Sequence, residues 1–358
     1  MIQSLRRPCL PARSLARTLL LGALCFGASL GAASTLTSCS SSGPRKPGDD
    51  LGLTDKQKLG LFYENALRYY DLGDIDRAQV QARNGLEVDP GNEKFLLIFG
   101  RCNLLRGNAQ DIQVAIDTFK RIRTKDDFKV QASWGAAVER LGMFYEEASE
   151  GIRSGDRSTD AADPMARADE LHETAVKYWS EAHDRFQRSL ELRSGEPEAI
   201  NGLVRTSALL GRTQESIAHA RSLVDAIQAS QRLVANELDN TEITAASEER
   251  LFKNRASNAE FEVKTRLYIA TALRREGDLS GAIDELDQII ALDPYLAQAH
   301  SQKAQLLFEA GDFVKARASI TRFLEMRAPT STVNDPDIKQ AFELRERCDR
   351  NIVKPRQG

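Results

Sequence analysis

Histidine and cysteine are the side chains of this 358-residue chain that could bind a metal ion or act as a nucleophile. The four histidines are His172, His183, His219 and His300, and none has a second histidine or a cysteine at the spacing that zinc sites use. The sequence also lacks a glycine-rich phosphate loop, a nucleophile elbow and a paired-carboxylate motif. We therefore predict no enzyme activity, no metal site, no cofactor and no small-molecule substrate.

A short motif, Gly-Asp-x-x-x-Ala, indicates how the rest of the chain is organised. It occurs at 73–78, 277–282 and 311–316, so the last two copies begin 34 residues apart and the first two 204 residues apart, which is six such periods. A fixed period near 34 is typical of a solenoid of stacked helix-turn-helix units. A generic helical bundle is the alternative, although a bundle has no reason to repeat at one period.

Each copy of the motif can form the turn between two antiparallel helices. In the first copy Gly73 permits the backbone conformation that ends one helix, and Asp74 can cap the next helix. Pro90 then stops the second helix, because proline cannot continue it. The small residues Ala66 and Ala78 would let the two helices approach closely. The sequence therefore predicts an all-α fold.

These units resemble the tetratricopeptide repeat (TPR) family. The resemblance is strongest at 59–92, 263–296 and 297–330, less regular at 197–230, degenerate at 93–126 and expanded at 128–194. It implies a helix-turn-helix solenoid of about six repeats over 56–330, followed by a C-terminal capping helix and tail at 331–358.

Two stretches depart from the repeat pattern. Residues 149–164 are polar, and we expect them to form a loop inserted after a helix that ends near Glu150. Residues 228–262 lack a turn glycine, and we expect extended helices there, broken at about 237–246. The second of these helices should run through Arg275.

The resemblance also implies where a partner would bind, because the first helices of TPR units line a concave groove. Counting from the turn glycines places these residues in the groove: Tyr63, Leu67, Tyr70, Leu97, Arg101, Leu104, Asn201, Arg205, Lys264, Leu267, Thr271, Arg274, Gln298, Ser301, Gln305 and Phe308. Aromatic and aliphatic groups at one end, with arginines further along, suit an extended peptide or an amphipathic helix.

The beginning of the predicted groove allows a second interpretation. Tyr63 and Leu67 could instead pack against an N-terminal helix or a neighbouring chain. The same two residues occupy positions where some TPR domains use a lysine and an asparagine to clamp a C-terminal carboxylate. Recognition of that kind is therefore not supported.

The N-terminal segment is of a different kind. Four arginines precede a charge-free stretch from 18 to 44 with an apolar run at 19–26, the layout of a secretory signal. Residues 36–39, Leu-Thr-Ser-Cys, resemble the bacterial lipobox, a cleavage site directly before a cysteine. That resemblance implies a lipoprotein signal peptide at 1–38, with Cys39 acylated, as by palmitate, at the start of the mature chain. An uncleaved membrane anchor and a cleaved signal without lipid are the alternatives.

The residues after Cys39 bear on location and charge. Residues 39–55 are rich in serine, glycine and proline and should form a flexible tether. By resemblance, Ser40 after the lipid cysteine favours the outer membrane, with the domain facing the periplasm, over retention at the inner membrane. Removing 1–38 deletes four arginines and no acids, so the formal charge moves from −3 to −7. A mildly acidic domain argues against nucleic-acid binding.

Two cysteines remain in the repeat region and tail. A bridge between Cys102 and Cys348 would have to join an early repeat to the end of an extended solenoid, so we expect both thiols to be free. A bridge or a disulfide-linked dimer is the alternative.

The combined features predict a lipid-anchored scaffold. It would bind another envelope protein in its concave groove and assist assembly of a periplasmic or outer-membrane complex. This layout resembles the pilotins of type IV pili and secretins, and the accessory proteins of outer-membrane-protein assembly. The alternative function is an adaptor or regulator that binds cell-wall enzymes or glycans.

Overall fold

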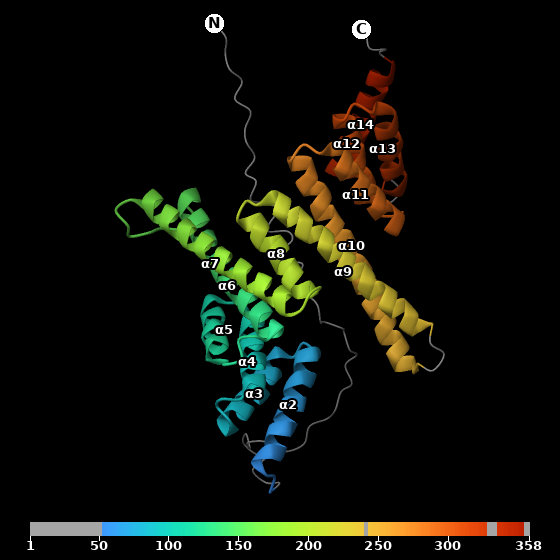
Figure 1. Cartoon of the computed structure of the whole chain (residues 1–358). Coiled ribbons are helices and arrows are strands. Elements are labelled where there is room, and N and C mark those ends of the chain that lie inside the picture. The colour runs from blue at the N-terminus through green and yellow to red at the C-terminus, as the bar shows by residue number, and fades with distance from the viewer. Residues whose placement is uncertain (1–51, 240–242, 328–334, 354–358) are drawn as a thin grey trace. The chain divides into compact units, whose positions relative to one another are not determined.

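The computed structural model of the chain describes residues 52–239, 243–327 and 335–353. Every regular element within these ranges is an α-helix (Figure 1), which confirms the predicted all-α fold. The predicted signal peptide, Cys39 and most of the predicted tether lie outside the described residues. None of the described helices is both long and apolar enough to span a membrane.

The chain divides after Arg212 into two compact units. The first unit contains α2 (Asp55–Asp71), α3 (Ile75–Val88), α4 (Glu93–Arg106), α5 (Ala109–Arg121), α6 (Phe128–Ser154), α7 (Pro164–Leu192) and α8 (Pro197–Leu209). The second contains α9 (Thr213–Leu238), α10 (Ala245–Arg275), α11 (Leu279–Leu292), α12 (Ala297–Glu309), α13 (Phe313–Arg327) and α14 (Pro336–Val353). The sequence predicted one solenoid over 56–330, whereas the division falls inside the predicted repeat 197–230.

The Gly-Asp motif forms the same turn in all three copies. Gly73, Gly277 and Gly311 have φ of 75°, 85° and 83°, the left-handed region that glycine adopts without steric cost. The N–H of each following aspartate donates to the carbonyl five residues earlier at 2.9 Å and closes the helix end. Each aspartate carboxylate then accepts the backbone N–H three residues later, at 3.2, 2.9 and 3.1 Å, and caps the next helix.

Small residues let the helices of each pair approach closely. Ala66 and Ala78, predicted for this role, are fully buried, and the equivalent alanines of two further pairs are almost fully buried: Ala270 with Ala282, and Ala304 with Ala316. Glycines do the same against aromatic rings. A Cβ atom placed on Gly202 would lie 2.5 Å from the ring of Phe186, which is itself fully buried.

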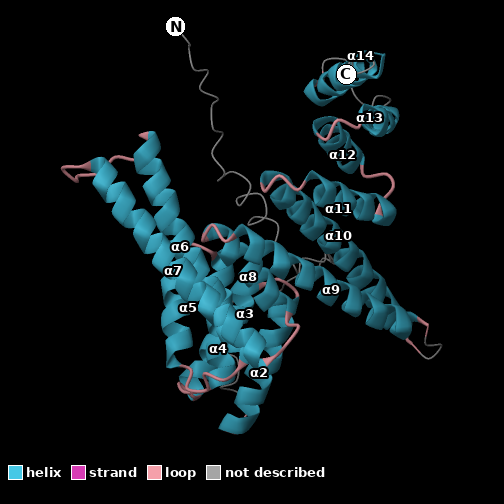
Figure 2. Ribbon diagram, turned by 45° about the horizontal axis from the view of Figure 1, so that its top comes forward, coloured by secondary structure: helices cyan, strands magenta, loops and turns pink. Residues whose placement is uncertain are grey.

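The pair α6 and α7 is the longest in the first unit, with 27 and 29 residues (Figure 2). Helix α6 continues to Ser154, so the connection is 155–163 and the predicted loop at 149–164 is too long. The buried Ser149 hydroxyl donates to the carbonyl of Ala168 at 2.7 Å, and Arg153 pairs with Asp169 at 2.6 Å. The helix extends further than its polar composition suggested, because these polar groups bond across the hairpin.

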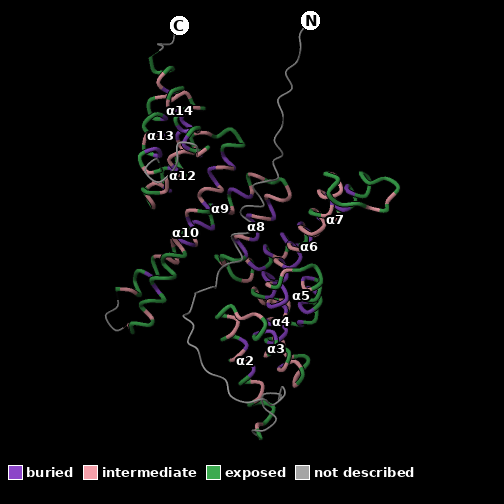
Figure 3. Tube along the Cα trace, turned by 180° about the vertical axis from the view of Figure 1, so that it is seen from behind, coloured by how far each residue is buried: buried purple, intermediate pink, exposed green. Residues whose placement is uncertain are grey.

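In the second unit, α9 and α10 form the extended pair expected around 228–262. The predicted break falls between them, and α10 runs to Arg275. Glu262 on α10 is only 1% exposed and accepts hydrogen bonds from Gln228 at 2.8 Å and Gln231 at 3.2 Å on α9. Towards its N-terminal end α10 is mostly exposed, and Leu251 is the buried residue there (Figure 3).

Helix α14 covers the end of the second unit. It packs on α13 and α12 and buries Ile338, Ala341, Leu344 and Cys348. Phe342, on the same helix, is 38% exposed. The helix therefore has the amphipathic character of a solenoid cap.

Two glycine-to-alanine variants should have opposite effects on the first unit. In Gly202→Ala the new methyl group collides with Phe186, so we expect the free energy of unfolding to fall by about 1–3 kcal/mol. In Gly60→Ala the exposed helical site is open, so the free energy of unfolding should rise by about 0.5–1 kcal/mol. Both tryptophans of the chain, Trp134 and Trp179, lie in this unit, so urea unfolding followed by tryptophan fluorescence measures both effects. Equal midpoints for the two variants would contradict the packing described.

Candidate functional site

The predicted groove residues are shared between the two units. Half of them lie on α2, α4 and α8 of the first unit, and half on α10 and α12 of the second. Each unit therefore has its own set, and we describe the two sets separately.

The arginines of the first unit are occupied by internal contacts. Arg101 on α4 donates to Ser133 Oγ at 2.9 Å and to a carboxylate oxygen of Glu198 at 3.0 Å. Arg205 on α8 makes two parallel hydrogen bonds to Glu139 on α6, at 2.7 and 2.6 Å. The side chains of Arg205 and Glu139 are 16% and 4% exposed. These arginines hold α4, α6 and α8 together, so neither is a free cation for a partner.

Glu139 stabilises the charged form of Arg205. Burial alone would lower the pKa of its guanidinium, but the attraction and hydrogen bonds of Glu139 outweigh burial, and the pKa is raised. The guanidinium of Arg205 therefore keeps its charge, as expected of a structural contact.

The apolar positions of the first unit are mostly used in packing. Tyr63 meets Phe95 edge-on at 5.8 Å, and Lys94 lies 5.3 Å from the Tyr63 ring. Burial raises the pKa of Tyr70. Tyr63 thus packs on α4, and Leu67, 37% exposed, is the most accessible apolar residue of this set.

The remaining residues of the first set add little free surface. Leu104 is buried, Leu97 packs against the core, and Asn201 is half-buried. The first unit brings its predicted residues onto neighbouring helices, but most of them are committed to the fold.

The second unit contains a groove of about 1220 Å³ between α12 and α14. Five of the eight residues predicted for this unit line it: Arg274, Gln298, Ser301, Gln305 and Phe308. The other three do not. Lys264 makes an exposed ion pair with Glu260, Leu267 is half-buried, and the Thr271 hydroxyl donates to a backbone carbonyl of its own helix.

The floor and the edges of this groove differ in chemistry. Buried apolar side chains form the floor: Ile320, Phe323, Ala341 and Leu344. Along α12, Gln298, Ser301 and Gln305 have no side-chain hydrogen bond to any other residue that the structure describes. The site therefore combines an apolar base with donors and acceptors that are free to pair with a ligand.

The α14 wall of this groove was not predicted. Gln340, Glu343 and Arg347 line it, although the sequence pattern indicated only a capping role for this helix. The apolar spacing of Ile338, Ala341 and Leu344 indicates which face of α14 packs on the preceding helices. Such spacing does not show that a groove remains between the two helices.

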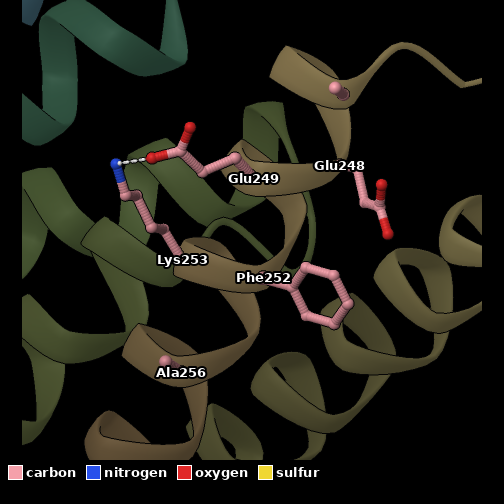
Figure 4. Close-up of a pocket in the computed structure, with 6 residues that line it drawn as sticks. Glu248, Glu249, Phe252, Lys253 and Ala256 are labelled. Carbon is pink, nitrogen blue, oxygen red and sulfur yellow. Dashed lines mark ion pairs between the residues drawn. The ribbon is translucent and has the colours of Figure 1, made fainter.

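A second hollow, on α10, is a weaker candidate (Figure 4). It is lined by residues of this one helix, with the ring of Phe252, 52% exposed, on one side and the ion pair of Glu249 and Lys253, 2.7 Å apart, on the other. No other described element contributes polar groups to it. It therefore lacks the converging side chains of a binding site.

The two described cysteines are free, as predicted, and the structure places both of them in buried positions. Burial raises the pKa of Cys102 to about 12 and also raises that of Cys348. Both thiols stay protonated at neutral pH, so neither is a nucleophile.

Removing one partner of the buried pair in the first unit should be strongly destabilising. Glu139→Ala leaves the buried Arg205 charge without its hydrogen-bonded carboxylate, so we expect a loss of about 3–5 kcal/mol in the free energy of unfolding. Asp117→Ala breaks an exposed pair with Lys120 and should change it by less than about 0.5 kcal/mol. Urea unfolding followed by tryptophan fluorescence compares the two variants. A loss in Glu139→Ala no larger than in Asp117→Ala would show that Arg205 is not held as described.

Comparisons with known proteins match the helical-repeat architecture. The tetratricopeptide repeat profile matches residues 267–332. The tetratricopeptide repeat and J domain-containing co-chaperone DNJ1 of Cryptococcus neoformans is 33% identical over 75 residues, which are 21% of this chain and 13% of that protein. The matched part thus spans about an eighth of the relative's length.

Two solved structures are also similar. TTC0263, a TPR protein of Thermus thermophilus, is 16% identical, with 71% of this chain and 100% of that chain covered and a TM-score of 0.39. The pilF protein of Pseudomonas aeruginosa is 11% identical, with 84% and 90% covered and a TM-score of 0.33. The profile match, together with the Gly-Asp turns between paired helices at Gly277 and Gly311, shows that residues 267–332 contain tetratricopeptide repeats.

Proposed function

We propose that this protein is a lipid-anchored scaffold of the bacterial envelope whose second unit holds a segment of another envelope protein. TPR domains bind peptide or protein partners on their concave surfaces. The observation that carries the proposal is the groove between α12 and α14, where an apolar floor lies beside unpaired amide and hydroxyl groups. By positioning its partner, the scaffold assists assembly of a periplasmic or outer-membrane complex.

The chemistry of the groove suits an extended peptide. Each glutamine amide offers both a donor and an acceptor, which match the N–H and C=O of a peptide group. A helical segment has already paired most of its backbone groups, whereas an extended one leaves them available. The volume of about 1220 Å³ also exceeds the roughly 300–1,000 Å³ of small-molecule sites. A peptide segment therefore fits better than a small ligand.

Loss of the α12 amides should weaken partner binding without unfolding the protein. In Gln298→Ala/Gln305→Ala two hydrogen-bonding groups of the groove disappear, so we expect the affinity for the partner to fall about tenfold. Gln288→Ala removes an exposed amide of α11 outside the groove and should bind normally. Partners are first identified by co-purification from envelope extracts. Each purified partner is then titrated against the wild-type protein, Gln298→Ala/Gln305→Ala and Gln288→Ala. A partner that binds all three equally does not use this groove.

The proposed anchor makes a separate prediction about location. Cys39→Ala removes the lipid attachment site, so the protein should move from the membrane fraction to the soluble fraction. Cys25→Ala changes a cysteine within the predicted signal peptide and should leave the protein in the outer-membrane fraction. Cell fractionation with blotting compares the two. A Cys39→Ala protein that stays membrane-bound would favour an uncleaved anchor instead.

A further inference from the structure

We propose that the groove of the second unit recognises a carboxylate on its bound peptide, and that Arg347 of the capping helix α14 receives it. This inference rests on the proposed peptide-binding function of the groove and names the chemistry of the ligand. It assigns a recognition role to a helix outside the repeats.

Arg347 differs from the other arginines of the groove. Arg274 pairs with Glu309, and Arg327 pairs with Asp335 at 3.8 Å. The guanidinium of Arg347 has no carboxylate within 4 Å among the described residues. It is therefore the groove arginine whose charge remains available to a ligand.

An aromatic ring holds Arg347 in position. Its guanidinium carbon lies 4.4 Å from the centre of the Phe308 ring on α12, and Phe308 in turn meets Phe313 edge-on at 5.2 Å. Stacking of this kind uses the face of the guanidinium and leaves its N–H groups free. Those groups can donate two parallel hydrogen bonds to one carboxylate. Because the cation is already ordered, less side-chain entropy is lost on binding.

The acids of α14 restrict where a ligand carboxylate can lie. Asp337 and Glu343 also line the groove, and both precede Arg347 on the helix. At 1.5 Å per residue, Asp337 lies about 15 Å and Glu343 about 6 Å before Arg347 along the axis. A second acidic residue near Asp337 or Glu343 would be repelled, whereas a basic one would be attracted. The groove therefore favours a peptide whose carboxylate lies at the Arg347 end.

Either a side-chain carboxylate or the C-terminal carboxylate of a chain would supply this chemistry. The experiment is a selection from two random-peptide display libraries, one with free C-termini and one with internal peptides, on the full-length protein. We expect wild-type protein to select peptides enriched in aspartate or glutamate at one position, or peptides with a free C-terminus. Enrichment in both libraries identifies a side chain, and enrichment only with free C-termini identifies a chain terminus; both outcomes support the proposal.

Charge reversal tests the role of Arg347 itself. Arg347→Glu should lose at least about tenfold in affinity for the selected acidic peptides and should select lysine or arginine at the same position. Arg345→Glu is the matched control, because it makes the same charge change on the same helix but its guanidinium lies over Phe342, 5.0 Å away, outside the groove. The control should select the same peptides as wild type. Arg347→Lys keeps the charge without the planar fork and should lose less affinity than Arg347→Glu.

The possible failures are distinguishable. If neither library yields peptides that bind the wild-type protein and compete for the groove, the proposed function fails, and this inference with it. If groove-binding peptides show no acidic preference, or bind Arg347→Glu as tightly as wild type, the carboxylate role of Arg347 is wrong and the peptide groove stands. Equal losses in Arg345→Glu and Arg347→Glu would assign the effect to net charge and overturn the proposal.

Discussion

The close approach of paired helices is the constraint on which the other features depend. Alanine at facing positions, and glycine against aromatic rings, leave so little space that a single added methyl group at Gly202 would meet Phe186. In a helical repeat each layer rests only on its neighbours, so the spacing of one pair sets the position of the next. The groove between α12 and α14 results from the same spacing, because α13 packs on both helices and supplies part of the floor.

The features that could be predicted from sequence are those set by a few adjacent residues. A glycine followed by an aspartate determines both the left-handed helix end and the following cap, so the turns at Gly73, Gly277 and Gly311 follow from local chemistry. The end of α6, up to Ser154, is stabilised by contacts with Ala168 and Asp169 on the opposite helix. These contacts are not visible in the local sequence, so the polar residues at the end of α6 suggested a loop. The division after Arg212 has no local signal, since Gly211 forms the same kind of turn as the other copies.

At the candidate site, too, local positions could be predicted from the sequence and contacts between distant residues could not. Positions on α12 lie at fixed offsets before Gly311, and counting from that glycine placed Ser301, Gln305 and Phe308 in the groove. The arginines of the first unit were expected to face a partner, but their acids stand 97 residues away for Arg101 and 66 for Arg205. The contribution of α14 was missed because a capping helix has no repeat positions from which to count.

Helix α14 is both the last helix that the structure describes and one wall of the groove. A terminal helix has neighbours on one side only, so it detaches and redocks more readily than helices within the array. The groove exists only while α14 is docked, so the apparent affinity for a ligand scales with the docked fraction. By linkage, a bound segment would hold α14 in place, and binding would protect the C-terminal end from proteolysis and from hydrogen exchange.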